Sequence, residues 1–197
     1  MSATAAHPGT APIRRFPLPR LGLAAGLVAL AVALLAFHHA LRVGEARLAT
    51  PLLEWATGHP ALAVSGEPLV LVGLGTSWSS ALEVSVMCSA AVLFVPSVVV
   101  SAVLALPSQI EVGRLLTALG VCALAVLATN TLRILVIALS MEQWGAGRGY
   151  VLAHDTLGTF VSLVGVGIAL LLFVRLTVGR ISRPNGAARS ATGHHRG

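Results

Sequence analysis

The sequence has few charged residues and no lysine. Asp, Glu, Lys and Arg make up only 10% of the 197 residues, and all thirteen basic residues are arginine. A soluble domain usually carries about 25% charged residues. The hydrophobic fraction is 56% and the mean hydropathy is +0.87, so polar groups are too few to cover the surface. This composition excludes an ordinary soluble protein and predicts that lipid surrounds much of the chain.

Negative charge is also scarce, with seven acidic residues, a net charge of +6 and a pI near 11.3. A basic balance is found in nucleic-acid-binding proteins. Here, however, the arginines cluster at the ends of apolar runs, as membrane topology requires, so we expect no nucleic-acid partner. The absence of lysine and the richness in Ala, Val, Leu and Gly are typical of a GC-rich bacterial genome.

Four apolar runs dominate the sequence, and each is long enough to cross a bilayer as a helix. We predict an all-α integral membrane protein of about four transmembrane helices, with one membrane domain over residues 21–176. The predicted spans are about 21–41, 83–106, 115–141 and 155–176. A cleaved signal peptide is the alternative for the first run, but that run is longer than usual and no A-x-A site follows it.

The segment between the first two spans is predicted to be an outer loop of mixed short elements. Residues 42–58 fit an amphipathic helix on the membrane surface. Residues 68–73 and 82–86 fit short extended pieces. The apolar side of the amphipathic helix is expected to carry Leu48, Leu52, Leu53 and Trp55.

The distribution of arginine predicts the orientation in the membrane. Residues 1–20 and 177–197 are interpreted as basic cytoplasmic tails, the second of them disordered. With both tails inside, the cytoplasmic segments hold nine arginines, and the outer loops, including one over residues 142–153, hold three. We therefore expect a multi-pass protein of the cell membrane whose two termini are cytoplasmic.

Three chemically active residues are expected near the outer ends of three different spans. Cys88 lies about one and a half turns into the second span, Arg133 about two turns below the outer end of the third, and His154 at the outer start of the fourth. All three reach the outer leaflet or its interface, so they are able to line one pocket.

Arg133 carries the most information of the three. An arginine at the centre of a span costs about 2.5–3.5 kcal/mol on insertion scales and is functional by default. The structural alternatives are snorkelling to the surface or an ion pair with Glu83, Glu142 or Asp155. Asn130 lies one turn earlier on the same helix face, where it either orients the guanidinium or bonds a neighbouring helix.

The cysteines and the histidine also have structural alternatives. Cys88 fits a small packing residue, and His154, beside Asp155, fits an interfacial cap. Cys122 is expected about 16 Å deeper than Arg133 along the same helix. Because a disulfide needs Cα atoms within about 7 Å, Cys122 is interpreted as a packing residue.

A thiol, an imidazole and a guanidinium together fit nucleophilic acyl transfer. The thiolate attacks a carbonyl, the histidine moves the proton, and the fixed cation stabilises the oxyanion. No set of metal ligands competes with this interpretation, and we expect no cofactor.

Three patterns in this order resemble the exosortase/archaeosortase family over roughly residues 80–176. They are the Cys-Ser element Val86-Met-Cys88-Ser89, the Asn-x-x-Arg element Asn130-Thr-Leu-Arg133, and the His-x-x-x-Gly element His154-Asp-Thr-Leu-Gly158. Two departures are Ala90, where the family has glycine after Cys-Ser, and a chain shorter than the typical eight-span member.

The resemblance implies a membrane transpeptidase that cuts a C-terminal sorting signal made of a short motif, a hydrophobic helix and a basic end. Cys88 would be the nucleophile, His154 the general acid/base and Arg133 the oxyanion stabiliser, with Asp155 at most tuning the histidine. The alternatives are a non-enzymatic subunit whose Arg133 pairs with a partner's acid, and a lipid-processing enzyme that binds a phosphate head group.

Overall fold

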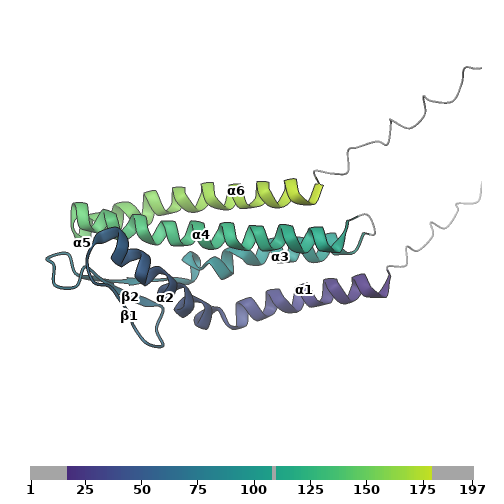
Figure 1. Ribbon diagram of the computed structural model, residues 1–197, viewed down its shortest axis with the longest axis horizontal. Coiled ribbons are helices and arrows are strands. Elements are labelled where there is room, and N and C mark those ends of the chain that lie inside the picture. The colour runs from purple at the N-terminus through teal and green to yellow at the C-terminus, as the bar shows by residue number, and fades with distance from the viewer. Residues whose placement is uncertain (1–16, 108–109, 179–197) are drawn as a thin grey trace, which may run out of the picture.

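The computed structural model describes residues 17–107 and 110–178, without the side chains of Met87 and Asp155. Most of both predicted tails therefore lies outside the described residues. The described part forms an antiparallel bundle of α1 (Leu18–Ala36), α3 (Ala90–Ala105), α4 (Val112–Trp144) and α6 (Gly158–Val178). Figure 1 shows that α1 begins and α6 ends at the same end of this bundle.

Three of the described helices are long and apolar enough to cross a membrane. They are α1, α4 and the continuous helix Ala146–Thr177 that contains most of α6. The apolar helix α3 has 16 residues, which extend about 24 Å, so it is the short member of the bundle. The prediction of an all-α membrane protein is confirmed.

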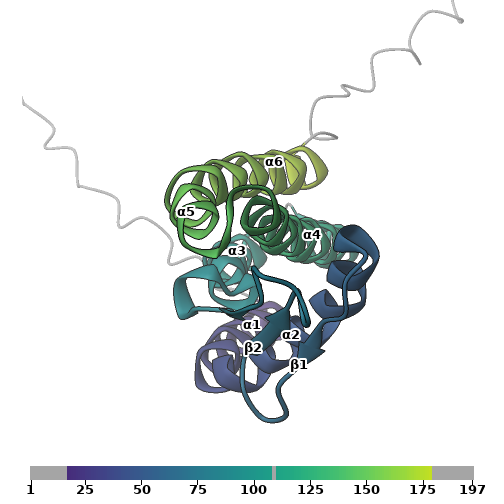
Figure 2. The same cartoon turned by 90° about the vertical axis from the view of Figure 1, so that its left-hand side faces the viewer.

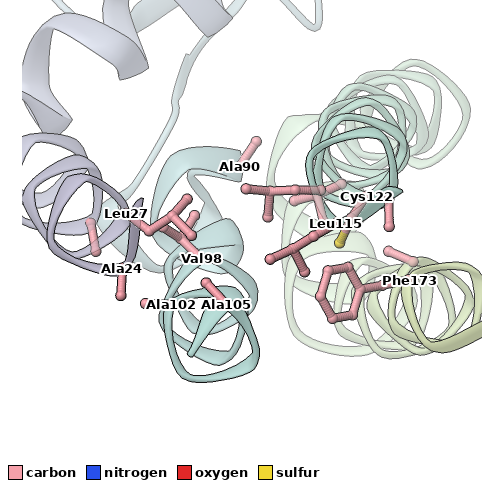
Figure 3. Close-up of a cluster of buried hydrophobic side chains, with 14 residues drawn as sticks. Ala24, Leu27, Ala90, Val98, Ala102, Ala105, Leu115, Cys122 and Phe173 are labelled. Atoms are coloured by element: carbon pink, nitrogen blue, oxygen red, sulfur yellow. The ribbon is translucent and has the colours of Figure 1, made fainter. Parts of the chain in front are cut away.

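A core made mainly of small and medium apolar side chains joins the four bundle helices (Figure 3). Its members include Ala24, Leu27, Val98, Ala102, Leu115, Cys122 and Phe173. Cys122 is fully buried, with its Sγ 3.4 Å from Ser97 Oγ. Both cysteines are free. The interpretation of Cys122 as a packing residue is confirmed.

At the end of the bundle where α1 begins, two arginines donate hydrogen bonds to carbonyls at the ends of neighbouring helices. Arg20 Nη1 donates to the carbonyls of Ala105, at 3.4 Å, and Pro107, where α3 ends. Arg114 Nε donates to the carbonyl of Leu176 near the end of α6. The last carbonyls of a helix lack intrahelical partners and attract cations, so both contacts close helix C-termini.

The opposite end of the bundle carries α2 (His38–Thr57) and a small antiparallel sheet (Figures 1 and 2). The described strands are β1 (Leu62–Ala63), β2 (Leu69–Val72) and β3 (Ser80–Glu83), in the order β1-β2-β3. The predicted helix over 42–58 and the extended piece over 68–73 are confirmed as α2 and β2. The second extended piece is present but shifted, since β3 covers residues 80–83 rather than 82–86.

A second core lies between α2, the sheet and α4. It includes Ala46, Ala49, Leu53, Val70, Val72, Ile134, Ile137 and Ala138. Leu53 is therefore a core residue rather than part of the predicted membrane-facing side of α2. Leu48, Leu52 and Trp55 are exposed, as such a side requires.

The second span is corrected at its beginning, because α3 starts at Ala90 and not at Glu83. Glu83 ends strand β3, and a 3₁₀ turn over Val86–Cys88 precedes the helix. An apolar run alone does not distinguish a strand from a helix, and here pairing with β2 holds residues 80–83 extended. Cys88 thus precedes α3 rather than lying inside it.

The fourth helix is corrected as well. After Gly145, whose φ is 80°, the chain becomes helical again as α5 (Ala146–Val151) and then a π-helical segment (Leu152–Leu157) that leads into α6. Most of the predicted loop over 142–153 is therefore helix. His154 lies in the π segment, not at the start of the helix. The first span is also shorter than predicted, since α1 ends at Ala36 and α2 follows at His38.

Candidate active site

One pocket at the sheet end of the bundle brings the three expected residues together. It is lined by Cys88 from the 3₁₀ turn, Arg133 from α4 and His154 from the π segment. The rest of its wall comes from the sheet region, α4 and α5: Val70, Leu82, Glu83, Val84, Ile134, Ile137 and Tyr150. The wall is mainly apolar, and its polar side chains are those of Cys88, Arg133 and His154 together with Glu83 and Tyr150.

Cys88 lies at the junction between β3 and α3. Its amide donates to the carbonyl of Ser85 at 3.0 Å, which closes the 3₁₀ turn. The residue is buried, and its side chain forms part of the pocket wall. This position, held by a turn before a helix, differs from the expected position inside a span but keeps the thiol in the same pocket as Arg133.

Arg133 is buried in α4, with 8% of its surface exposed. Its Nη1 donates to Ser162 Oγ at 3.0 Å, whereas its Nε has no hydrogen-bond partner among the described residues. Two expected ion-pair partners have other neighbours: Glu83 pairs with Arg42 at 2.9 Å, and Glu142 Oε1 lies 3.9 Å from His59 Nε2. The side chain of the third, Asp155, is outside the described residues. A buried guanidinium without a described carboxylate partner is suited to an oxygen acceptor entering the pocket.

Gly158 leaves the space that the Arg133 side chain occupies. A Cβ on Gly158 would lie 2.9 Å from Arg133 Nε and 2.8 Å from the carbonyl oxygen of Ala153. Both distances are too short for carbon, so only glycine leaves room for the guanidinium at this turn. This contact gives a physical reason for the glycine of the His-x-x-x-Gly pattern.

His154 is half-buried and stacks on Tyr150, with ring centroids 5.0 Å apart and an interplanar angle of 9°. The stack restricts the imidazole plane on the side of α5. Tyr150 was missed in the sequence analysis. The available signal was its spacing of four residues from His154, which places the two on one face of a helix.

Asn130 makes no described hydrogen bond to Arg133. Its Nδ2 donates to Glu45 Oε2 at 2.7 Å, so of the two expected roles the structure gives it the bond to a neighbouring helix. Glu45, from α2, is 8% exposed and also accepts from Ser89 Oγ at 2.9 Å and from the amides of Ala90 and Ala91 at 3.2 and 3.3 Å. The carboxylate thus caps the beginning of α3, directly after Cys88.

Arg42, like Glu45, is a buried charged residue whose contacts the sequence did not reveal. It lies one turn before Glu45 on α2, donates from Nε to the carbonyl of Val84, and pairs through Nη2 with Glu83. Arg42 and Glu45 therefore fix the two ends of the segment from β3 to α3 that carries Cys88.

Among the described residues, no group of three or more His, Cys, Asp or Glu side chains is placed to hold a metal ion. No protein-family model, no curated protein and no solved structure matches the chain.

Proposed function

We propose that this protein is a membrane cysteine transpeptidase or protease of the exosortase/archaeosortase type. It would cleave the C-terminal sorting signal of membrane-anchored exported proteins at the outer face of the membrane and transfer them to an acceptor. The observation that carries the proposal is the shared pocket of Cys88, Arg133 and His154, in which a buried guanidinium has no described carboxylate partner.

In the proposed reaction His154 accepts the thiol proton as the Cys88 sulfur attacks the scissile carbonyl carbon. Arg133 donates to the resulting oxyanion, in a pocket whose apolar wall strengthens the interaction. His154 then protonates the leaving amine, the C–N bond breaks, and a thioester remains on Cys88. An amine of the acceptor, or water, attacks the thioester and gives its proton to His154, the C–S bond breaks, and His154 returns the proton to the released Cys88 thiolate.

A thioester on Cys88 is the direct test of this chemistry. The full-length protein is incubated with a candidate substrate encoded by a neighbouring gene, one that ends in a short motif, an apolar helix and an arginine cluster. Mass spectrometry should find a substrate fragment joined to Cys88 and released by hydroxylamine. Cys122→Ala should keep this adduct, since Cys122 is buried in the bundle core.

Two results would favour the other functions. Stable association with a second membrane protein, lost on replacing Arg133 and accompanied by no adduct, would support a non-enzymatic subunit. Turnover of a phospholipid head group that is independent of Cys88 would support a lipid-processing enzyme.

The proposed orientation makes a separate prediction. Reporter fusions at residues 60 and 146 should both be external, because nine arginines fall in the segments assigned to the cytoplasm and three in the outer ones. Residue 60 closely precedes β1 and residue 146 begins α5, and both elements lie at the sheet end of the bundle (Figure 1), so the two fusions control each other. Cytoplasmic signals at both would place the pocket at the inner face and contradict action on exported proteins.

A further inference from the structure

Strand β3 has an open edge. The sheet order is β1-β2-β3, so β3 pairs with β2 on one side only. Val84 donates its amide to the carbonyl of Pro68 on the β2 side, at 2.8 Å. Since backbone groups in an antiparallel ladder point alternately to opposite sides, those of Leu82 also face β2. The N–H and C=O groups of Ala81 and Glu83 therefore point away from the sheet, where no described residue bonds them.

The strand that carries this open edge also forms part of the wall of the Cys88 pocket. Leu82, Glu83 and Val84 all line that pocket, and Cys88 follows only five residues after Glu83. Ala81 and Glu83 are both exposed, and no described residue bonds their outward backbone groups. An unpaired edge strand is a template for pairing with another extended chain.

Contacts made by Arg42 also fix the position of this edge. Pro68 has no amide hydrogen, so the carbonyl of Val84 cannot complete its ladder pair with that residue. Arg42 Nε donates to this carbonyl instead, and its Nη2 holds the Glu83 carboxylate at 2.9 Å. These contacts fix the end of β3 and leave the outward backbone groups of Glu83 unpaired. A binding edge fixed in advance loses little conformational entropy when a ligand binds.

We propose that the open edge of β3 binds the extended segment of a protein substrate next to its scissile bond, by strand addition. The inference rests on the proposed function. The occupant is an unfolded stretch of polypeptide, because only a peptide backbone offers donors and acceptors that alternate with the groups at Ala81 and Glu83. Recognition by backbone groups is tolerant of sequence, and the adjoining apolar wall then selects side chains.

The test uses the full-length Cys122→Ala protein, in which Cys88 is the sole cysteine. Iodoacetamide measures the reactivity of the thiol without a peptide. Acetyl-Ala-Ala-Ala chloromethyl ketone measures peptide binding as well, since a bound peptide holds the chloromethyl carbon next to the Cys88 sulfur and so speeds the displacement of chloride. Two further probes carry one N-methyl group each, on successive amides. One of these should label about tenfold more slowly than the parent and the other at the parent rate, because only alternate amides face β3.

Substitutions at Ala81 in β3 test the same edge by changing the protein instead of the peptide. Ala81→Pro removes one outward N–H without removing a bond to β2, and Ala81→Val keeps that N–H. The proline variant should label about tenfold more slowly with the peptide probe and at an unchanged rate with iodoacetamide. If Ala81→Pro fails to fold, the pair of N-methyl probes on the Cys122→Ala protein decides.

The outcomes separate the two proposals. Equal rates for both N-methyl probes, with normal iodoacetamide labelling, would overturn strand addition and leave the cysteine-enzyme proposal intact. A Cys88 that reacts with neither the peptide nor iodoacetamide would overturn both.

Discussion

Replacing Cys88 by Ala is expected to abolish processing of the cognate substrate while the protein accumulates at its normal level. The thiol supplies the electrons for the acyl transfer, and no other cysteine lines the pocket. The fold should persist, because a small buried side chain replaces another small one and the Cys88 amide keeps its bond to Ser85. The measurement is an immunoblot of substrate length in cells carrying each variant.

Two matched variants sharpen this prediction. Cys88→Ser should lose nearly as much processing, because a hydroxyl ionises far less than a thiol near neutral pH. Cys122→Ala should process substrate almost normally, since Cys122 packs inside the bundle beside Ser97. A Cys88→Ala protein that is made at the normal level and still shortens the substrate would rule out the cysteine enzyme in favour of the subunit.

The sequence predicted the bundle and the meeting of the three site residues for the same reason. Apolar runs give the number and direction of helices, and direction decides which helix ends meet. Cys88, Arg133 and His154 were therefore expected at one end of the molecule, where the structure has them in one pocket. Their catalytic roles remain predictions that the experiments above address.

The hydrophobic pattern of the sequence could not predict the buried charged residues around Cys88. Glu45 bonds Ser89 and Asn130, which are 44 and 85 residues away along the chain, and Arg42 pairs with Glu83 across 41 residues. Such contacts depend on how α2 folds back over the sheet, and an amphipathic pattern shows only that one side of a helix is apolar. The π segment at His154 was likewise not predicted, since such segments are rare insertions in α-helices.

Replacing Glu45 by Ala is expected to destabilise the protein by several kcal/mol. The change would leave Ser89 Oγ, Asn130 Nδ2 and the amides of Ala90 and Ala91 without their acceptor. Each buried donor left unpaired costs about 1–3 kcal/mol. Thermal unfolding in detergent should show a melting temperature well below that of the unchanged protein.

Removing the Glu45 carboxylate should also change the reactivity of Cys88. Because the amides that Glu45 caps follow directly after Cys88, removing the carboxylate should loosen the first turn of α3 and expose the buried thiol. In the Cys122→Ala background, iodoacetamide should then label Cys88 faster in the Glu45→Ala variant. In the Glu45→Gln variant, which keeps one acceptor oxygen, the labelling rate should lie between that of Glu45→Ala and that of the protein with Glu45 unchanged. Glu67→Ala is the matched control, since Glu67 is exposed and its carboxylate makes no described hydrogen bond, and it should change stability by less than about 0.5 kcal/mol. A Glu45→Ala protein that melts and labels like the control would show that the carboxylate does not hold the turn of Cys88.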